Sequence, residues 1–500
     1  MKVLFASSEL TPMAKVGGLG DVSGSLPKAL KFLGVDIRVV IPCYELIDEK
    51  KYQLKFLGKT KVNFGQINEK IRIYQTKIPD SEVIVYFIEN ENYLSRGGIY
   101  FEKTAFAGSF KEIERFLFFS QAILKIFEVI NWQPEIIHCQ DWHTAVLPVL
   151  VKLQIQNSKF KIQNLLTIHN LANQGRWNAQ EIFNFLGLKG DEIESLKIRF
   201  GSEQIDLNLI QQGILNADLI NTVSPSYAQE ILTKEFGEGL EETLKKRKRD
   251  LFGILNGIDT QRFSPERDKE IKVNYSLKNL EKKEINKKDL QKCCRLPTSN
   301  DSVFGFVGRL TNQKGSELIA KIIPELIKFG CQFVFLGQGD ESYENQLRDL
   351  ARRYFGNVYT KIGFDAKLAQ KIYAGADIFL MPSRFEPCGL GQMIAMRYGT
   401  IPIVRAVGGL KDSVENVKIT NSKISGNGFV FEKYESGSLF ETIKSALKLF
   451  KNKKIWQILQ RNAMKKDFSW EVSAKKYLKL YKKLYQSSKL HFDGLKIRND

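Results

Sequence analysis

The chain has 500 residues, of which 43% are hydrophobic and 26% charged, and it carries a formal net charge of +19 at pH 7. This length predicts at least two domains, and the composition is that of an ordinary soluble globular protein. No apolar run approaches the ~18 residues that cross a bilayer, so we expect no membrane span. The lysines are spread along amphipathic stretches, and the run 245–249 lacks the interleaved aromatic residues of a single-strand platform, so we expect no nucleic-acid partner.

The first residues, MKVLFASSEL, lack the long apolar core of a signal peptide and are typical of a first β-strand. The chain has six cysteines but no C-x-x-C pair, which indicates neither a disulfide framework nor a zinc ribbon. We therefore expect a cytoplasmic protein in a reducing environment.

Short β-branched runs alternate with segments of helical period, such as 23–33 and 110–130, through the first half of the chain. The predicted strands lie at 3–6, 37–41, 83–88, 135–139, 164–168 and 219–223. This alternation predicts parallel strands that are joined by crossover helices. The charged segment 266–295 contains no convincing strand, which predicts a linker or a surface helix.

The alternation then restarts, with predicted strands at 303–307, 332–336, 357–362, 377–381, 401–404 and 428–431. Two runs of about six strands predict an α/β fold with two doubly wound, Rossmann-like domains that face each other across a cleft. The predicted parts are residues 1–262, residues 263–470, a helix at 471–487 that packs back on the first domain, and a frayed tail at 488–500.

The stretch 378–398 combines several features of a ligand site. A short apolar strand ends at Pro382, Glu386 follows in the loop, and Gly389-Leu390-Gly391 opens a segment of helical period. Loops beyond the carboxyl ends of parallel strands are where ligands bind, and a helix N-terminus suits a phosphate. The alternative is an ordinary helix cap beside a solvated glutamate.

A second glycine-rich loop runs from Lys15 to Asp21 and precedes a helix that is predicted to begin near Ser23. It is not a dinucleotide fingerprint, because about ten residues separate the end of the first strand from its first glycine. Glycines let a ligand approach the backbone, and Lys15 offers a cation there. A flexible turn with a solvated lysine is the alternative.

The segment from His138 to His143 has the ingredients of a metal site. His138 and Cys139 would point to opposite faces of a strand, however, and a fourth ligand is not evident. We therefore favour Asp141 or His143 in a loop that lines the cleft, and we expect no metal.

Two further strands end in polar residues. His169 and Asn170 follow the strand 164–168, where a structural histidine and a cleft residue are both open interpretations. Arg309 and Lys314 follow the strand 303–307, and two cations at that place suit a diphosphate. A Walker A loop is absent.

Seven segments together resemble the bacterial glycogen synthase and plant starch synthase family: KVGGLGDVSGSLPKAL, HCQDWHTA, TIHNLANQG, NGID, VGRLTNQKG, PSRFEPCGLGQM and GGLKDSVEN. Members are retaining glucosyltransferases with the two-Rossmann, B-type fold, and the resemblance covers about residues 1–485. It implies transfer of glucose from ADP-glucose, or else UDP-glucose, to the non-reducing end of an α-1,4-glucan such as glycogen or starch. It also implies that no metal or prosthetic group takes part.

The resemblance places the acceptor side in residues 1–262 and the nucleotide-sugar site in residues 263–470. It implies catalytic roles for four residues: Lys15, Asp141, His169 and Glu386. The substrate-binding residues that it implies are Lys15, Gly18, Asp21, Asn170, Asn256, Arg309, Lys314, Phe364, Cys388, Gly389, Leu390 and Gly391.

The chemistry agrees with these roles. Cleavage of a glycosyl–phosphate bond leaves negative charge on the diphosphate, which Arg309, Lys314 and a helix N-terminus can stabilise. Glu386 can stabilise the oxocarbenium-like sugar. No second carboxylate is evident as a covalent nucleophile, so we favour attack on the same face within an ion pair.

Three positions depart from the family pattern. Val16 and Gly391 stand where threonine is common, and Phe364 stands where bacterial relatives often have tyrosine against the base. These changes put the base preference and the rate in doubt, and they permit a catalytically weak homologue that binds glucan or nucleotide.

Two related enzyme classes fit less well. Retaining transferases with a second glutamate eight positions after the first would need it at Ile394, and the lysine motif of glycogen phosphorylase is not visible.

Overall fold

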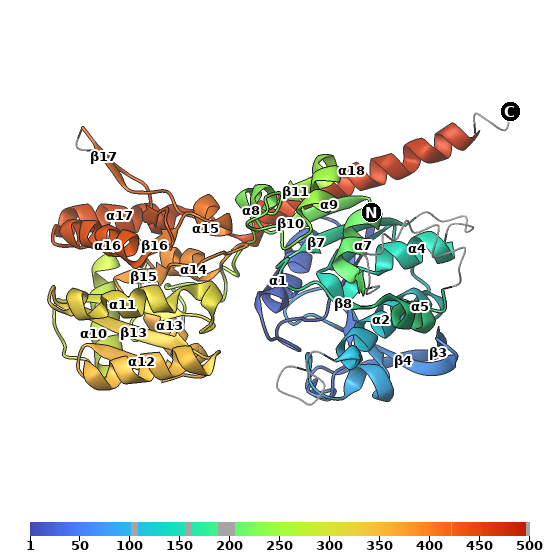
Figure 1. Cartoon of the computed structure of the whole chain (residues 1–500), viewed down its shortest axis with the longest axis horizontal. Coiled ribbons are helices and arrows are strands. Elements are labelled where there is room, and N and C mark those ends of the chain that lie inside the picture. The colour runs from blue at the N-terminus through green and yellow to red at the C-terminus, as the bar shows by residue number, and fades with distance from the viewer. Residues whose placement is uncertain (102–108, 156–161, 189–205, 422, 497–500) are drawn as a thin grey trace. The chain divides into compact units, whose positions relative to one another are not determined.

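The computed structural model describes residues 1–101, 109–155, 162–188, 206–421 and 423–496 (Figure 1). The chain forms two compact units. Unit 1 comprises Met1–Val223, Ala228–Gly257 and Trp470–Asp500, and unit 2 comprises Ser224–Tyr227 and Ile258–Ser469. None of the described helices is long and apolar enough to cross a membrane.

Unit 1 is built on a nine-stranded sheet with the order β11-β10-β7-β6-β1-β2-β5-β4-β3. Seven of these strands are parallel: β1 (Lys2–Ala6), β2 (Asp36–Pro42), β5 (Ile84–Glu89), β6 (Ile136–Gln140), β7 (Gln163–Ile168), β10 (Leu219–Thr222) and β11 (Leu251–Gly253). The strand order reverses between β1 and β6, which makes that junction the topological switch point where ligands of such sheets bind. The six strands predicted in this half are all present.

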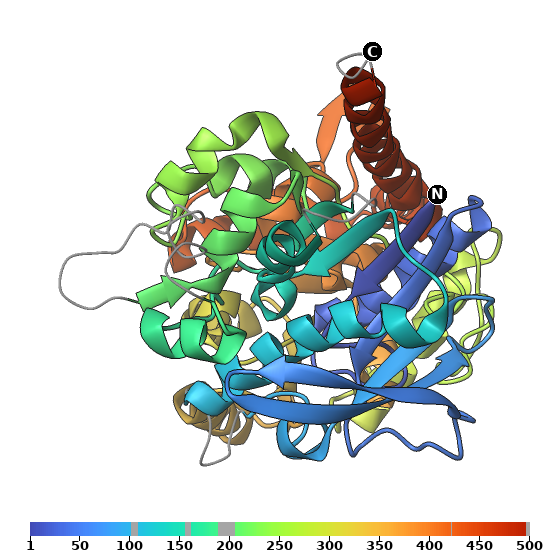
Figure 2. The same ribbon diagram turned by 90° about the vertical axis from the view of Figure 1, so that its right-hand side faces the viewer.

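The sequence did not predict the antiparallel hairpin of β3 (Lys55–Phe64) and β4 (Ile67–Lys77), which adds to the edge of this sheet (Figure 2). In β3 only Val62 and Phe64 are buried, because most of the strand faces solvent. Its lysine-rich sequence is a common property of edge strands, and it hides the β-signal. A separate two-stranded sheet pairs β8 (Arg176–Asn178) with β9 (Asp206–Asn208).

The helices of unit 1 include α1 (Gly18–Phe32), α2 (Phe110–Lys125), α3 (Phe127–Ile130), α4 (Leu147–Ile155), α5 (Ala179–Leu186), α7 (Leu209–Asn216) and α9 (Glu241–Lys246); α8 (Pro225–Glu230) starts within unit 2. Short helical turns occur at η1 (Glu91–Ser95), η2 (Trp142–Thr144) and η3 (Lys248–Asp250). Helix α1 begins at Gly18, so the predicted start near Ser23 is wrong. Asp21 lies in its first turn, where a carboxylate is favoured by the helix dipole.

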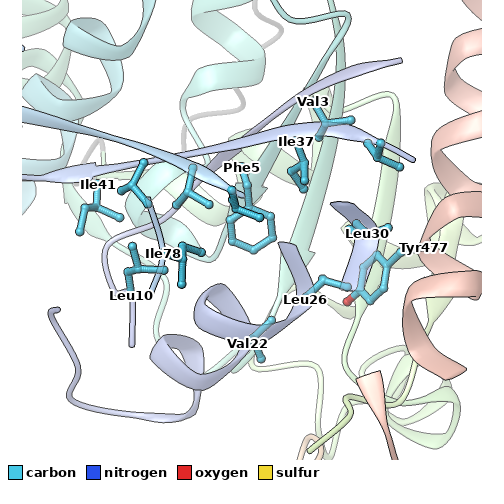
Figure 3. Packing of buried hydrophobic residues seen from close by; sticks show 14 of the residues in the cluster. Val3, Phe5, Leu10, Val22, Leu26, Leu30, Ile37, Ile41, Ile78 and Tyr477 are labelled. Carbon is cyan, nitrogen blue, oxygen red and sulfur yellow. The ribbon is translucent and has the colours of Figure 1, made fainter. Parts of the chain in front are cut away.

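The core of unit 1 lies between its sheet, α1 and the last helix of the chain, α18 (Trp470–Lys496). Figure 3 shows Leu26 and Leu30 of α1 close to Tyr477 of α18 beneath the strands. The helix therefore packs on unit 1, as expected. It also continues to Lys496, beyond residue 488, where the tail was predicted to begin; residues 497–500 lie outside the described chain.

Unit 2 contains a six-stranded sheet with the order β14-β13-β12-β15-β16-β19. All six strands are parallel and match the predicted ones: β12 (Ser302–Val307), β13 (Cys331–Gly337), β14 (Val358–Ile362), β15 (Ile378–Met381), β16 (Ile401–Arg405) and β19 (Phe429–Phe431). This is the doubly wound order 3-2-1-4-5-6, whose switch point lies between β12 and β15. A small exposed hairpin pairs β17 (Lys418–Thr420) with β18 (Lys423–Ser425).

The helices of unit 2 are α10 (Lys283–Cys293), α11 (Ser316–Ile327), α12 (Glu341–Arg353), α13 (Ala366–Gly375), α14 (Gly391–Arg397), α15 (Gly408–Ser413), α16 (Ser436–Phe450) and α17 (Lys453–Lys465) within the described residues. Short turns occur at η4 (Leu280–Lys282) and η5 (Asn312–Lys314).

Helix α10 lies in the charged segment 266–295, which we expected to be a linker or a surface helix. One face of α10 packs against α13, with Lys283 and Lys287 buried. The Lys287 ammonium lies 2.8 Å from the Asp377 carboxylate, and Lys283 donates to the Ala374 carbonyl oxygen at 2.7 Å. The segment is thus the surface helix of the two alternatives, since Glu284, Ile285 and Lys288 are exposed, but its composition does not reveal that Lys283 and Lys287 have buried partners.

Candidate active site

The predicted residues of unit 1 lie around its switch point. Lys15 and Gly18 follow β1, Asp141 follows β6 directly, and His169 follows β7 directly. Because these strands are parallel neighbours, their carboxyl ends lie on the same edge of the sheet. Asn256 follows β11 on the same edge; its side-chain oxygen is buried and has no hydrogen-bond partner within the described chain.

A buried glutamate that the sequence analysis missed shapes the first glycine-rich loop. The Glu9 carboxylate accepts hydrogen bonds from the backbone amides of Val16 and Gly17, each at 2.8 Å, and from the Tyr100 hydroxyl at 2.7 Å. Glu9 thus holds the backbone of the loop in place. Its position just after the first predicted strand was the signal that could have identified it.

The cation of this loop is already paired. The Lys15 ammonium lies 2.6 Å from the Asp21 carboxylate in the first turn of α1, and both side chains are partly exposed. Val16 is exposed, so its apolar side chain faces solvent where the family commonly has a hydroxyl.

Asp141 occupies a left-handed backbone conformation, with φ of 52°, directly after β6. Its carboxylate accepts hydrogen bonds from the backbone amides of His169 at 2.7 Å and Asn170 at 3.4 Å. Burial raises the pKa of Asp141 to about 7, and the charge of Glu9 adds to this effect, although the two amide bonds oppose it. Asp141 is therefore a carboxyl group that titrates near neutral pH.

His169 is a neutral imidazole with a defined orientation. Burial lowers its pKa to about 3. Its Nε2 lies 2.8 Å from the side-chain oxygen of Gln140, and with the amide oriented this way Nε2 carries the proton. Nδ1 is then a hydrogen-bond acceptor at the strand end.

The remaining histidines of this region serve packing. His143 lies against Trp142 and Phe116, and burial lowers its pKa to about 3. Both ring nitrogens of His138 are occupied, by the Tyr481 hydroxyl at 2.8 Å and the Thr167 hydroxyl at 2.7 Å. In the part of the chain that the structure describes, no three histidine, cysteine or acidic side chains are grouped as metal ligands.

The predicted residues of unit 2 meet at its own switch point, between β12 and β15. The Lys314 ammonium lies 2.6 Å from the Glu386 carboxylate, which also accepts a hydrogen bond from the Ser383 hydroxyl at 3.0 Å. Glu386 is only 5% exposed. Arg309 is exposed, and its guanidinium donates to Gln313 at 3.2 Å. One buried carboxylate is thus held by a lysine, with a second cation nearby in sequence.

The loop that carries Glu386 is in direct backbone contact with the turn after β16. Gly408 has a φ of +43°, and a Cβ atom there would lie 2.0 Å from the carbonyl oxygen of Glu386. A Cβ atom on Gly409 would lie 2.2 Å from the carbonyl oxygen of Cys388. These glycines belong to the family-like segment GGLKDSVEN, but their role in seating Glu386 depends on contacts between distant segments.

Gly391, which stands where threonine is common in the family, is closely packed against strand β15. A Cβ atom on Gly391 would lie 2.9 Å from the Phe379 ring and 3.4 Å from the Met381 sulfur. The space that a threonine side chain would need is therefore filled by two residues of β15. Phe364 follows β14 at the same strand edge and is 84% exposed, so its ring is accessible for stacking.

Three further predicted positions, Cys388, Gly389 and Leu390, lie in the loop between Glu386 and helix α14. Cys388 is buried, and its carbonyl oxygen accepts a hydrogen bond from the Gln392 side chain at 3.2 Å. Gly389 has a φ of +71°, and Leu390 caps helix α14. Asp21 and Gly18 lie within the first turn of α1, in unit 1.

Two family models match the chain. Residues 2–246 match the starch synthase catalytic domain, and residues 295–463 match the glycosyl transferases group 1. Each match falls almost wholly within one of the two units.

Full-length relatives agree with these matches. The chain is 43% identical to glycogen synthase of Thermosipho melanesiensis, over 97% of this chain and 99% of that protein. It is also 43% identical to glycogen synthase of Lactobacillus acidophilus, over 97% of this chain and all of that protein. The catalytic domain of starch synthase IV from Arabidopsis thaliana, solved with ADP and acarbose, superposes with a TM-score of 0.88 at 33% identity, and covers 97% of this chain and 99% of that one.

Proposed function

The chain belongs to the glycogen and starch synthase family of glucosyltransferases, and from that premise we propose that it transfers glucose from ADP-glucose to the non-reducing end of an α-1,4-glucan, with retention. The ion pair of Lys314 and Glu386 at the switch point of unit 2 is the observation that carries this proposal. In this proposal Lys314 is the cation that binds the leaving diphosphate, and Glu386 is the carboxylate that acts on the reacting sugar. The relative solved with ADP and acarbose supports a nucleotide donor and a glucan acceptor.

In this proposal the bond between the anomeric carbon and the phosphate oxygen breaks first, and its electron pair leaves with ADP. Lys314 and Arg309, together with the backbone amides of Gly389–Gly391, bind the diphosphate and lower the energy of that charge. Glu386 faces the developing positive charge on the sugar. The acceptor hydroxyl attacks the same face, and its proton passes to the departing phosphate oxygen.

Three residues of unit 1 hold the glucosyl group and the acceptor. The Asp141 carboxyl and the neutral His169 imidazole are suited to accept hydrogen bonds from sugar hydroxyls, since each has a fixed orientation. Lys15, held by Asp21, supplies a cation near the donor phosphates. We also assign Gly18, Asn170 and Asn256 of unit 1 to substrate binding.

We propose that the reaction needs no metal or prosthetic group, since Arg309, Lys314 and backbone amides supply the positive charge that a divalent cation otherwise gives. We also propose that the enzyme acts in the cytosol. Cys43, Cys139, Cys294 and Cys331 are buried thiols, as a reducing compartment would keep them.

The test is glucose transfer onto glycogen from ADP-glucose and from UDP-glucose in parallel, with EDTA present. We expect rapid transfer from ADP-glucose and an α-1,4 linkage in the product, which nuclear magnetic resonance identifies by its anomeric proton. The Glu386→Ala variant is the control for background transfer.

Each other result contradicts a separate part of the proposal. Preference for UDP-glucose would support the enzyme class but contradict the assignment of ADP-glucose as the donor. If EDTA abolishes the transfer, the proposal that the reaction needs no metal is wrong. ADP binding without transfer from either donor would identify a binding homologue.

A further inference from the structure

Tyr434 contacts two arginines at the carboxyl-terminal edge of the unit 2 sheet. It follows β19, whereas Arg384 follows β15 and Arg405 ends β16. The guanidinium carbon of Arg384 lies 4.2 Å from the centre of the Tyr434 ring, and that of Arg405 lies 5.5 Å from it. Stacking on an aromatic face is favourable for guanidinium groups, so the ring holds both arginines.

The hydroxyl of Tyr434 reaches a third segment. It donates a hydrogen bond to the Glu317 carboxylate on α11 and lies 3.4 Å from the carbonyl oxygen of Asn312. Burial and the Glu317 carboxylate raise the pKa of Tyr434, so the phenol stays protonated and remains a donor. One side chain therefore connects the loops that follow β19, β15 and β12.

The loops after β12 and β15 are joined next to this ring. The Arg384 amide donates to the Gln313 carbonyl oxygen at 2.8 Å, and its guanidinium Nε donates to the Asn312 side chain at 2.9 Å. Gln313 in turn donates to the Phe385 carbonyl oxygen at 3.2 Å. Directly beyond these contacts, one residue further along each loop, lies the ion pair of Lys314 and Glu386.

Arg405 completes the arrangement. Its guanidinium donates to the Glu432 carbonyl oxygen at 3.0 Å and to the Arg384 carbonyl oxygen. These donors are directed at protein backbone, which is the geometry of a structural support. We call the set of Tyr434, Arg384, Arg405 and Glu317 the tyrosine brace.

We propose that Tyr434 is a positioning residue for glucosyl transfer: through the tyrosine brace it fixes the two loops that present Lys314 and Glu386. The proposal rests on the proposed function, because it assigns those two residues to the reaction. A displacement of about 1 Å at reacting groups lowers rates by up to 10²-fold, so a brace outside the reaction centre has a measurable effect. Nothing about Tyr434 in the sequence marks it, since its partners are 29 to 122 residues away.

The test compares four variants with the wild-type enzyme. Tyr434→Leu removes both the ring and the hydroxyl, whereas Tyr434→Phe keeps the ring against the guanidinium groups. Arg405→Lys keeps the charge but replaces the planar fork of guanidinium donors with a single ammonium group. Tyr354→Leu is the matched control, because that half-buried tyrosine ends α12 at the opposite edge of the sheet.

We expect Tyr434→Leu and Arg405→Lys to lower kcat roughly tenfold and to raise the KM for ADP-glucose, without a change in the KM for glycogen. Tyr434→Phe keeps most of the rate, and Tyr354→Leu keeps all of it. All rates are measured well below each variant's melting temperature, so that loss of folded protein does not contribute.

If both Tyr434→Leu and Arg405→Lys keep the wild-type kcat and the wild-type KM for ADP-glucose, the proposal that the tyrosine brace positions Lys314 and Glu386 is wrong. If Tyr434→Leu fails to fold, Arg405→Lys decides by the same criterion. Calorimetric measurement of ADP binding separates this proposal from the proposed function. If the wild-type enzyme transfers no glucose, the proposed function is wrong. Weaker ADP binding in the brace variants than in the wild type would then still support the positioning of Lys314.

Discussion

Burial controls the protonation of Asp141, and this has a consequence for stability. Its native pKa of about 7 lies above the value of 3.8 of an unperturbed aspartate, so between these pH values the native chain binds more protons than the unfolded chain. The contribution of Asp141 to the free energy of unfolding therefore falls as the pH rises from about 4 to 7. At neutral and higher pH the buried Asp141 carboxylate therefore lowers the free energy of unfolding.

We predict that Asp141→Asn raises the melting temperature relative to wild type more at pH 8 than at pH 5, because the amide carries no charge to bury. The difference corresponds to roughly 2–4 kcal/mol, since one unit of pKa shift is about 1.4 kcal/mol. Glucosyl transfer falls in the same variant. Thermal melts at several pH values check this, with the exposed Asp340→Asn as control; a difference that is constant from pH 5 to pH 8 contradicts it.

A second prediction concerns Gly408, whose missing side chain allows the Glu386 loop to approach. Gly408→Ala places a Cβ atom 2.0 Å from the Glu386 carbonyl oxygen, so the loop must move, and we expect kcat to fall by roughly 10²-fold. Gly437→Ala is the matched control, because nothing lies within 4 Å of its Cβ position. Equal activity of the two variants, measured on glycogen with ADP-glucose, would refute the contact.

At the scale of the elements, all the parallel strands of the two sheets except the short edge strand β11 could be predicted from sequence. Each is a short β-branched run followed by a helical segment, so periodicity alone locates it. The β3–β4 hairpin could not be found in this way, because its exposed strands carry lysines where a buried strand has apolar residues. Helix α10 was expected as a surface helix, but its two buried lysines could not be predicted, since their partners lie far away in the sequence.

The pair of Lys287 and Asp377 leads to a prediction for α10. Lys287→Met leaves the buried Asp377 carboxylate without its cation, and the loss of one partner of a buried pair costs about 3–5 kcal/mol. We expect a melting temperature lower by several degrees, measured by calorimetry. Lys288→Met, on the exposed side of the same helix, should leave it unchanged. If both variants melt like wild type, α10 contributes no buried ion pair to unit 2.

At the scale of the whole molecule, each unit carries its own switch point, and the sequence predicted most of what gathers there. Lys15, Asp141 and His169 meet in unit 1, and Arg309, Lys314 and Glu386 follow the central strands of unit 2. These positions could be recognised from the sequence because they lie in glycine-rich turns or are polar residues directly after predicted strands. Glu9 and Tyr434 were not predictable, because their importance comes from partners that only the fold brings together.

The most direct measurement is the effect of Glu386→Gln on transfer and on ADP binding. We predict that kcat falls by at least roughly 10³-fold, as for loss of a group that stabilises charge in the transition state. The Kd for ADP stays the same or falls, because Lys314 is released from its carboxylate for the diphosphate. The exposed Glu441→Gln is the control. A variant that retains the wild-type kcat, or that loses ADP binding in proportion to rate, would contradict the assignment of Glu386 to the reaction.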